Sequence, residues 1–593
     1  MGLSGIKKIW RSRYGHGNGT AYDYRPVVNT FFAIEFAALG QSPRASHFIN
    51  ILLYACILFM LFLVLKRILV NYPFKESFAF LCCILFAAHP IHTEVVDSLK
   101  SRDELLGLLF GLLCLWQVLR FEASRKKMAL VWAVMFFFLA LYSKLTSAVF
   151  MGIIPVTLWL FTNTNKRNLI IFICAAGLLF FIQGQLKKML VTEEEVRILY
   201  HFENPMATED LSLLARTLFA LKTFGIYIRL LLFPWPLRYY YGCSVITSNI
   251  SMTDTDVWIS IFFMVAAVVF CYRTRNKLAI YGLLIFLISI APVLNFVRPV
   301  AGIVGERLTF IPSVGFLFFL TAVVFQFYTK TQARFVVGSL FKKPMIYLTV
   351  CLPAFLIYDW QRNTAWKDEI TLFERDAPHL ERSAGANSLL ANKYAEFLYK
   401  NDPRYTRTFL VEKSWEYFNL AIKADSSVYA AINNAGAIAL RYMNRPDVAL
   451  DYFLRSVRIQ PDYPQAYENM GDCYLALNRK QEAVAALQTA ISQNEKQFRA
   501  YILLSTTLMD LQKFKEALVV LQKGKTNFPG SYSMAEREGT AYYLMGEKER
   551  GLTLLENAYQ LNPNKELAKT LADHFLVLGM SDKAKFYELA ASQ

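Results

Sequence analysis

The chain has 593 residues, of which 55% are hydrophobic and 15% aromatic, and only 18% are charged. Its mean hydropathy is +0.31, and its formal net charge is +17. These values exclude an ordinary soluble protein and predict an integral membrane protein.

The positive charge is unevenly distributed along the chain. Before Asp359 there are 34 lysines and arginines against 17 acidic residues, whereas from Asp359 onward the counts are 29 and 29. The cations of the first part gather in polar segments between apolar runs, at 122–127, 162–168, 273–277 and 330–343. This positive-inside pattern is typical of a membrane protein with several spans, and we expect no nucleic-acid partner. The nine cysteines show no CxxC spacing, so they predict neither a disulfide framework nor a zinc module.

Ten apolar runs are long enough, or nearly long enough, to cross a bilayer. They lie at 47–65, 73–89, 105–121, 128–142, 147–161, 168–184, 257–272, 278–296, 309–328 and 344–358. If the basic segments face the cytoplasm, the alternation of spans places 89–107, 143–144, 185–256 and everything after Asp359 on the opposite side.

Two segments disagree with this simple topology. Residues 213–233 are apolar but contain Arg216, Lys222 and Arg229, so we expect an amphipathic helix at the outer membrane surface that ends before Pro234. The first 25 residues are basic and contain no apolar signal, yet the alternation places them outside. From this conflict we expect that the recorded chain begins after a missing first span.

Beyond Asp359 a 34-residue repeat replaces the apolar runs. Small residues recur at two positions of each unit, first as Ala437, Gly471, Ser505 and Gly539, and twelve residues later as Ala449, Ala483, Ala517 and Gly551. Pro461, Pro529 and Pro563 close three of the units, and Glu495 takes this place in the other. The pattern is that of the tetratricopeptide repeat, whose small residues let two helices approach. We predict an α-solenoid of five or six units, with a degenerate unit at 387–426 and a terminal cap at 566–593.

Ionisable residues are concentrated in the stretch HPIHTEVVDSLKSRDELLG, at 89–107. Four of the 17 acidic residues of the first 358 positions lie between Glu94 and Glu104, namely Glu94, Asp97, Asp103 and Glu104. One interpretation is a polar loop whose charges neutralise each other. However, ionisable groups so close to a membrane are candidates for function. A metal site of His89, His92 and Glu94 lacks recognisable ligand spacing, so we prefer proton transfer or substrate binding.

Three more polar segments, at 22–26, 142–147 and 297–316, are expected on the same side of the membrane. With Arg102 of the stretch 89–107, they contribute five of the cations expected on this side, Arg25, Arg102, Lys144, Arg298 and Arg307. Each alone could simply reach toward the membrane surface. Together they predict a basic pocket beside carboxylates, which suits a lipid-linked anionic substrate. The cations would hold the phosphate while a carboxylate activates an acceptor hydroxyl, and residues 213–233 would border the entrance for the lipid tail.

These segments, in this order, resemble the transmembrane and tetratricopeptide-repeat-containing O-mannosyltransferase-like family of the GT-C membrane glycosyltransferases. The motifs that carry the resemblance are YRPVVNTFFAIEFAALG (24–40), HFINILL (47–53), LFAAHPIHTEVV (85–96), SRDELLGLLF (101–110), YSK (142–144), LLLFPWPLRYYYG (230–242) and GERLTFIPSVGF (305–316), followed by the repeats. The resemblance extends over nearly the whole chain.

The resemblance implies transfer of a sugar, mannose, from a polyprenyl-phosphate donor to a hydroxyl of a protein acceptor at the extracytoplasmic face. It implies no cofactor, because the lipid-linked sugar is a substrate, and its partners are membrane lipid, the polyprenyl-phosphate sugar and a protein or peptide acceptor bound by the solenoid. The matching positions give the candidate site residues Arg25, His89, His92, Glu94, Arg102, Glu104, Lys144, Glu306 and Arg307.

The chain departs from the family pattern at two places. The family motif SKE reads SKL here, with Leu145 in place of the carboxylate. The resemblance implies a catalytic acid in the first outer loop, just after the first span, and we expect that this chain starts beyond that point. We therefore consider Glu94, Asp97 and Asp23 as candidate catalytic residues.

The predicted fold is all-α, with a polytopic helix bundle followed by a solenoid. The expected parts are an outer loop at 1–46, a GT-C-like membrane domain at 47–358, a linker at 359–386 and the solenoid at 387–593. We expect the bacterial inner membrane rather than the endoplasmic reticulum, with the solenoid outside the cytoplasm. A catalytically silent scaffold that recruits proteins through the solenoid is the alternative function. A transporter is less favoured, because the spans have almost no ionisable residues near their centres.

Overall fold

The computed structural model describes residues 2–12, 24–191, 199–243, 246, 250–331 and 344–592. Within these ranges the chain is helical and contains no strand, which confirms the all-α prediction. The chain divides into two compact units, Met1–Ala386 and Asn387–Gln593.

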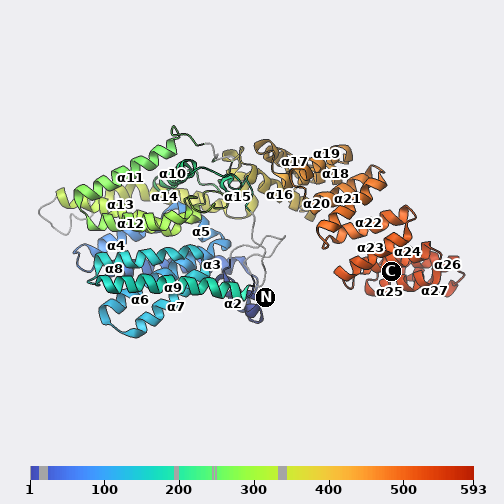
Figure 1. The fold of residues 1–593 in the computed structure, drawn as a ribbon, viewed down its shortest axis with the longest axis horizontal. Helices are drawn as coiled ribbons and strands as arrows, with labels where there is room; N and C mark the ends of the chain where they lie inside the picture. The colour runs from blue at the N-terminus through green and yellow to red at the C-terminus, as the bar shows by residue number, and fades with distance from the viewer. Residues whose placement is uncertain are drawn as a thin grey trace. The chain divides into compact units, whose positions relative to one another are not determined.

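The first unit is a helix bundle (Figure 1). Each of the ten apolar runs contains a helix, and shorter helices join them. The helices are α1 (Ile6–Ile9), α2 (Pro26–Leu39), α3 (Pro43–Ile68), α4 (Lys75–Ala87), α5 (Thr93–Asp97), α6 (Arg102–Ser124), α7 (Lys127–Ser143), α8 (Phe150–Phe161), α9 (Lys166–Leu190), α10 (Leu213–Leu232), α11 (Thr255–Thr274), α12 (Lys277–Ile290), α13 (Phe310–Thr331), α14 (Pro344–Ala365) and α15 (Glu369–Asp376).

Fewer helices than expected are long enough to cross a membrane unaided. In the described part of the chain five segments meet the length and hydropathy of a span, and α4 with Pro90–Asp97, bent by 57°, makes a sixth. The five are Pro43–Ile68, Leu99–Ser124, Lys166–Leu190, Thr255–Thr274 and Glu306–Gln326. Helices α7, α8 and α12 have 17, 12 and 14 residues, because turns at Lys144 and before Pro292 interrupt their apolar runs.

Large apolar side chains on the outside of the bundle fit a lipid environment. On α9 the only buried residue is Gln183, and Phe181 is 61% exposed. On α11, Phe262 and Tyr272 are 76% and 78% exposed. Contiguous exposed apolar surface of this kind marks contact with a membrane or a partner. The candidate spans and this exposed apolar surface together indicate that the first unit crosses the membrane several times.

Helix α10 lies across one end of the bundle. Its Lys222 Nζ is 2.6 Å from Oδ2 of Asp254, the N-cap of α11. The Tyr227 hydroxyl accepts from Gly305 N ahead of α13 at 3.4 Å, and Leu231 O accepts from His89 Nε2 after α4 at 3.0 Å. All these partners belong to the ends of other helices. The predicted helix therefore forms and ends before Pro234, and its position at the membrane surface stays a prediction.

Two glycines let α12 and α13 pack with their backbones in contact. A Cβ atom on Gly315 would lie 2.4 Å from Phe286 N, and one on Gly282 would lie 2.5 Å from Phe319 N. These distances are below van der Waals contact, and the obstructing atoms are backbone. Phe286 and Phe316, whose ring centroids are 5.3 Å apart, fill the space beside the crossing. The two helices are therefore closely packed where they cross.

The second unit is the predicted solenoid. It consists of paired helices, which are α16 (Ala384–Lys400), α17 (Arg407–Ala424), α18 (Tyr429–Arg441), α19 (Pro446–Ile459), α20 (Pro464–Ala476), α21 (Lys480–Gln493), α22 (Phe498–Asp510), α23 (Phe514–Asn527), α24 (Tyr532–Leu544), α25 (Lys548–Leu561), α26 (Lys565–Val577) and α27 (Ser581–Ser592). The degenerate repeat that was predicted at 387–426 is the helix pair α16 and α17.

The small residues of the repeat lie where its helices touch. A Cβ atom on Gly471 would lie 2.5 Å from Leu487 Cγ, and one on Gly551 would lie 2.7 Å from Gly539 O. Residues 566–593 were predicted as a cap, and nearly all of them lie in the last helix pair, α26 and α27. A cap is expected to be polar on its outer face, yet this pair exposes Leu576, Val577, Met580, Phe586 and Leu589.

Candidate active site

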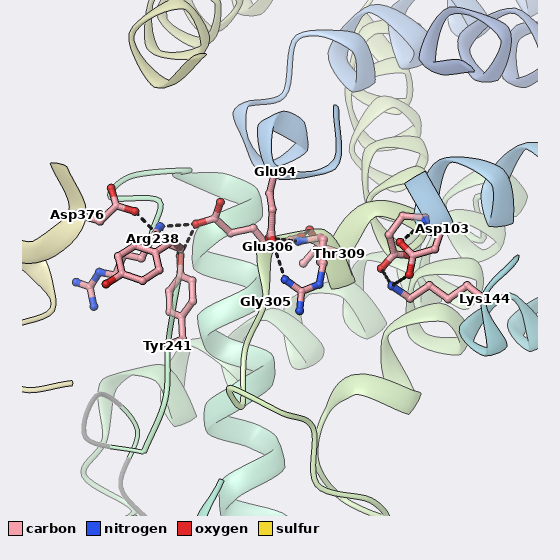
Figure 2. A network of polar contacts seen from close by, with 12 residues as sticks. Glu94, Asp103, Lys144, Arg238, Tyr241, Gly305, Glu306, Thr309 and Asp376 are labelled. Carbon is pink, nitrogen blue, oxygen red and sulfur yellow. Dashed lines mark hydrogen bonds and ion pairs between the residues drawn. The ribbon is translucent and has the colours of Figure 1, made fainter. Parts of the chain in front are cut away.

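The stretch 89–107 forms a folded turn between α4 and α6. It contains the 3-10 turn Pro90–His92, the short helix α5 and the first turns of α6. Asp97 ends α5, so Glu94 and Lys100 lie on different helical segments. Partners from α2, α3, α7 and the segment before α13 meet the turn at the same end of the bundle. Figure 2 shows Glu94, Glu306, Asp103 and Lys144 in this region.

The two histidines hold the turn in place. His89 Nδ1 accepts from Ile91 N at 3.3 Å, and Nε2 donates to Leu231 O at 3.0 Å. His92 Nδ1 lies 2.8 Å from Phe86 O, and Nε2 lies 2.9 Å from Ser313 Oγ. Both rings are 2% exposed and use both nitrogens. Their geometry therefore fits positioning of the turn better than the substrate contact that we expected.

Glu94 and Arg307 form an ion pair across 213 positions of sequence. Arg307 N donates to Glu94 Oε2 at 2.9 Å, and its guanidinium pairs with Oε1. The Arg307 side chain is 35% exposed, compared with 15% for Arg25, 7% for Lys144 and 0% for Arg102. Among the expected cations that form ion pairs here, Arg307 is the one that solvent or a ligand reaches most easily.

Arg102 is buried within α2, α3 and α6 with every side of its guanidinium occupied. Nε donates to Asn50 Oδ1 and Nη2 to Ser46 O, both at 2.8 Å, and Nη1 pairs with Glu35. The ring of Phe32 covers the guanidinium at 4.2 Å. Arg102 thus joins three helices, and it does not face open space as a substrate ligand would.

A second charged group combines Arg25, Asp103, Glu104 and Lys144. Lys144 Nζ pairs with Glu104 and lies 3.1 Å from Asp103 Oδ2 (Figure 2). Arg25 Nη1 reaches the same Asp103 oxygen at 2.5 Å. The two carboxylates begin α6, where negative charge is favoured by the helix dipole. Arg307 interacts electrostatically with both acids, so this group and the Glu94 pair form one charged assembly.

Glu306 belongs to a third group that the sequence did not reveal. Its carboxylate accepts from Arg238 N and from the Tyr241 hydroxyl, the latter at 2.8 Å (Figure 2). Burial, with the charge of Glu306, raises the pKa of Tyr241 well above its usual value, so the hydroxyl stays protonated and donates. Arg238 and Tyr241 lie in the motif at 230–242, but no pattern distinguishes them from neighbouring tyrosines.

The predicted linker at 359–386 is part of the first unit. Arg362 and Asp376 form a bidentate pair at 2.5 and 3.0 Å, and Tyr239 N donates to Asp376 Oδ2 at 2.8 Å. Arg362 is 1% exposed. A buried bidentate pair fixes the end of α14 against the loop after α10. The composition of this segment gave no sign of burial, because it is mostly polar.

Asp97 does not join Glu94 and Arg307. Its Oδ1 lies 3.5 Å from His47 Nε2, and its Oδ2 lies 2.8 Å from the Asn363 amide when this amide is oriented to donate. Asp359, just beyond the apolar run 344–358, is close by. Burial, and the charge of Asp97, raise the pKa of Asp359 from 3.8 to about 7.

The structure brings most of the expected site residues to one end of the bundle but pairs their charges. Arg298 is exposed on the loop before α13, and Asp23 lies outside the described residues. The open basic pocket that we expected is instead a set of ion pairs. In the described ranges no three His, Cys, Asp or Glu side chains form a group that could hold a metal ion. Chemically, the site offers one partly exposed arginine held beside one carboxylate.

The fold and the site together define a class, a multi-pass membrane protein with an ionisable cluster at one end of its bundle and a C-terminal helical-repeat unit. The tetratricopeptide-repeat family model matches residues 434–498 and 474–532. This match agrees with the predicted repeat.

Three curated relatives extend this comparison. The chain is 24% identical over 508 residues to protein O-mannosyl-transferase TMTC3 of Homo sapiens, covering 79% of this chain and 48% of that protein. It is 24% identical to F38B6.6 of Caenorhabditis elegans (59% and 48% covered) and 24% identical to TMTC2 of Homo sapiens (62% and 52% covered), both also named protein O-mannosyl-transferases. The resemblance found in the sequence is thus confirmed. The chain spans about half the length of the curated relatives it matches.

Among solved structures, the chain aligns with the crystal structure of YrrB, described as a TPR protein with an unusual peptide-binding site. The identity is 20%, the alignment covers 33% of this chain and 94% of that chain, and the TM-score is 0.28. A likeness at this score carries no argument about function.

Proposed function

We propose that the protein is a membrane glycosyltransferase that transfers a sugar, mannose, from a polyprenyl-phosphate donor to a hydroxyl of a protein acceptor. The names of the relatives support the reaction type. The observation in this chain that supports it best is the partly exposed Arg307 paired with Glu94. The lipid-linked sugar is a substrate in this proposal, and no cofactor takes part.

The ion pair suggests how donor binding prepares the site. An incoming phosphate competes with Glu94 for the Arg307 guanidinium, because both are anions that a guanidinium binds in a bidentate manner. Glu94 is then released as a base. The acceptor oxygen attacks the anomeric carbon, the bond from this carbon to the phosphate oxygen breaks, and the polyprenyl phosphate leaves with the electron pair. Glu94 takes the acceptor proton.

Arg25 and Lys144 have a supporting electrostatic role in this proposal. They neutralise Asp103 and Glu104, which would otherwise repel a phosphate at Arg307. Two buried carboxylates without counter-ions would also be costly. His89, His92 and Arg102 position the turn that carries Glu94, and Glu306 positions the loop after α10.

An apolar groove offers a place for the lipid chain. It has a volume of about 790 Å³ and lies between α10, α11 and α13, lined by Trp258, Phe262, Ala266, Phe319 and Val323 among others. Helix α13 is the helix that follows Arg307. A polyprenyl chain in this groove would leave its phosphate near the end of the bundle, where Arg307 lies.

The membrane orientation belongs to the same proposal. The positive-inside pattern supports a candidate site and a solenoid outside the cytoplasm, and we propose the bacterial inner membrane as the location. Limited proteolysis of sealed inverted and right-side-out vesicles tests the orientation, because only the extracytoplasmic side would expose the solenoid.

The experiment that tests the enzyme is transfer of radiolabelled mannose from polyprenyl-phosphate mannose to serine- and threonine-containing peptides. Glu94→Gln keeps the shape of the side chain and removes the base, so we expect kcat to fall at least a hundredfold. Glu76→Gln is the matched control, because Glu76 forms a half-exposed pair with Lys66 elsewhere on the bundle. Equal activity of the Glu94→Gln variant and the wild type would contradict the proposal.

A catalytically silent scaffold is the second candidate. The observation that favours it is the pairing of Arg25, Arg102, Lys144 and Arg307 with carboxylates. A scaffold would tolerate Glu94→Gln and Arg307→Ala in a cellular assay but would lose function when the solenoid surface is altered. The two candidates therefore predict opposite results for the same variants.

A further inference from the structure

Basic side chains gather at the end of the bundle opposite to the candidate active site. Helices α6 and α7 connect the two ends, because Glu104 and Lys144 pair at one end and the segment 120–127 joins the helices at the other. Helix α8 follows the turn at Lys144, so the segment 162–168, which joins α8 to α9, lies at the same end as 120–127. These two segments contain six lysines and arginines and one acidic residue.

Within the described part of the chain, the cations that begin α7 and α9 form no ion pair. Glu122, the one acidic residue of the two segments, pairs with Arg125 at 3.0 Å. The remaining cations next to the two helix starts are all exposed, and they are Lys126, Lys127, Lys166 and Arg167. Unpaired cations on two neighbouring helices attract an anion to this place.

The helix starts themselves also favour an anion. The first turn of a helix carries partial positive charge, so a lysine there lowers stability and an anion raises it. Lys127 is the first residue of α7 and Lys166 is the first residue of α9, and neither helix has an acidic residue in its first turn. At α7 no described side chain caps the backbone N–H groups. A phosphate bound here would offset the repulsion and accept from these donors.

An apolar groove lies between α6, α7, α8 and α9, next to these cations. It has a volume of about 70 Å³ and is lined by apolar side chains and Cys114. Leu130 and Phe172 line it three and six residues after Lys127 and Lys166, respectively. Because a helix rises about 1.5 Å per residue, the groove begins roughly 5–9 Å from the cations. A space this narrow and apolar is unfavourable for water and admits a hydrocarbon chain.

We propose that the groove and the four cations bind one anionic phospholipid, such as phosphatidylglycerol. The phosphate lies among the lysines and the arginine, and one hydrocarbon tail follows the groove between α7 and α9. Basic pockets between membrane helices bind the head groups of anionic lipids, and here the apolar lining adds a place for the tail. The groove shares no lining residue with the one proposed for the sugar donor. The inference therefore goes beyond the proposed function and does not depend on it.

The bound lipid stabilises the position of α9. Gln183 is the only buried residue of this helix, so few contacts within the protein fix α9 to its neighbours. A tail in the groove contacts α7, α8 and α9 together, because all three line it. A ligand that binds only the folded state raises the melting temperature, and this gives a readout that is independent of sugar transfer.

The test compares phosphatidylglycerol with phosphatidylcholine of identical tails, each added to the full chain in detergent micelles. Native mass spectrometry measures the affinity of each lipid, and the melting temperature is recorded in parallel. We expect phosphatidylglycerol to bind at least tenfold more tightly and to raise the melting temperature more than phosphatidylcholine. Inorganic phosphate in large excess should not displace it, because a free anion gains nothing from the groove.

Two double variants test the contacts of the head group. Lys127→Gln/Lys166→Gln should weaken binding of phosphatidylglycerol at least tenfold and leave binding of phosphatidylcholine unchanged. Arg273→Gln/Arg275→Gln is the matched control. It removes the same charge from two exposed arginines at the turn between α11 and α12, which does not line the groove. The control should change the affinity less than twofold.

Two single variants on α9 test the place of the tail. Ala175 is exposed and lines the groove, so Ala175→Phe fills the groove without disturbing the core and should weaken binding of phosphatidylglycerol at least tenfold. Cys174→Phe is the matched control, because the neighbouring Cys174 is also exposed but does not line the groove. It should change the affinity less than twofold.

Three results would overturn the inference. Equal affinities for the two lipids would show that the cations do not select the head group. Equal losses in the two double variants would mean that the overall positive charge of this end attracts the lipid without a site. Equal effects of Ala175→Phe and Cys174→Phe, or displacement of the lipid by inorganic phosphate, would exclude the groove as the place of the tail.

Discussion

Two arginines of the candidate site, Arg102 and Arg307, have opposite surroundings although both precede a membrane helix. Arg102 is fully buried and bonded to Glu35, Ser46 and Asn50, whereas Arg307 is 35% exposed and bonded to Glu94. Removing a buried cation leaves an uncompensated carboxylate, while removing an exposed one leaves a carboxylate that water reaches. The first arginine therefore stabilises the fold, and the second is available for a ligand.

Arg102→Met tests the structural role. It leaves Glu35 buried without a counter-ion, so we expect a loss of about 3–5 kcal/mol in the free energy of unfolding. The Arg102→Met/Glu35→Leu double variant removes both charges and should recover most of this loss. Denaturant unfolding in detergent micelles measures both variants. A double variant no more stable than the single one would show that the ion pair is not the cause.

Asp359→Asn tests the carboxylate cluster at the end of α14. The pKa of Asp359 is raised from 3.8 to about 7 in the folded protein, so the folded state binds the proton more tightly than the unfolded state. The contribution of Asp359 to stability therefore falls as the pH rises from about 4 to about 7 and then stays constant. We expect Asp359→Asn to raise the melting temperature at pH 8 and to leave it unchanged at pH 4.

The control for this prediction is Glu412→Gln, which changes an exposed carboxylate on α17. In this variant the difference in melting temperature between pH 4 and pH 8 should be the same as in the wild type. An Asp359→Asn variant with the wild-type pH dependence would mean that burial does not perturb this group.

The candidate residues were predictable from the sequence, but their partners were not. The charged turn at 89–107 stands out because polar residues are rare between apolar runs, and it contains Glu94. The pairing of Glu94 with Arg307 depends on tertiary packing across 213 positions, which local patterns do not encode. Tyr241, Arg362 and Asp376 were missed for the same reason, since each looks like an ordinary loop residue.

Helix packing explains why α12 and α13 contain glycines at their crossing. Gly315 has the backbone of Phe286 within 2.4 Å of any added Cβ atom, so the helices approach as closely as two backbones can. A side chain there would force the two helices apart. Glycine in a helix otherwise lowers stability relative to alanine.

Gly315→Ala tests this packing. We expect a loss of about 1–3 kcal/mol in the free energy of unfolding, because the obstructing atoms are backbone and cannot rotate away. Gly177→Ala on α9 is the matched control, since no atom lies within 4 Å of its added Cβ. It should be neutral or stabilising by about 0.5–1 kcal/mol. Equal effects of the two substitutions, measured by denaturant unfolding, would contradict the packing argument.

The apolar runs of the sequence predicted the presence of each helix better than its length. All ten runs contain helices, and 213–233 forms the helix α10 almost residue for residue. Helices α7, α8 and α12 are shorter than a span because turns interrupt them, a local effect that hydropathy averages out. The repeat was predicted best, since its small residues recur in register and each must lie at a helix contact.

The molecule combines two compact units with different physical signatures. The first unit holds most of the net positive charge and the exposed apolar surface, and the second is close to electrically neutral and built from repeats. Composition alone predicted this division. It did not predict that residues 359–386 belong to the first unit, because burial of Arg362 and Asp376 is a consequence of folding and leaves no trace in composition.

The proposed mechanism depends on a phosphate that takes the place of Glu94 at Arg307. The most direct measurement is the affinity of polyprenyl-phosphate mannose for the full chain in lipid nanodiscs, compared for the wild type, Arg307→Ala and Arg298→Ala. Arg298 is the matched control, an exposed arginine on the loop before α13. We predict that Arg307→Ala weakens binding at least tenfold and Arg298→Ala less than twofold. Equal binding by the two variants would contradict the proposed role of Arg307 in binding the phosphate.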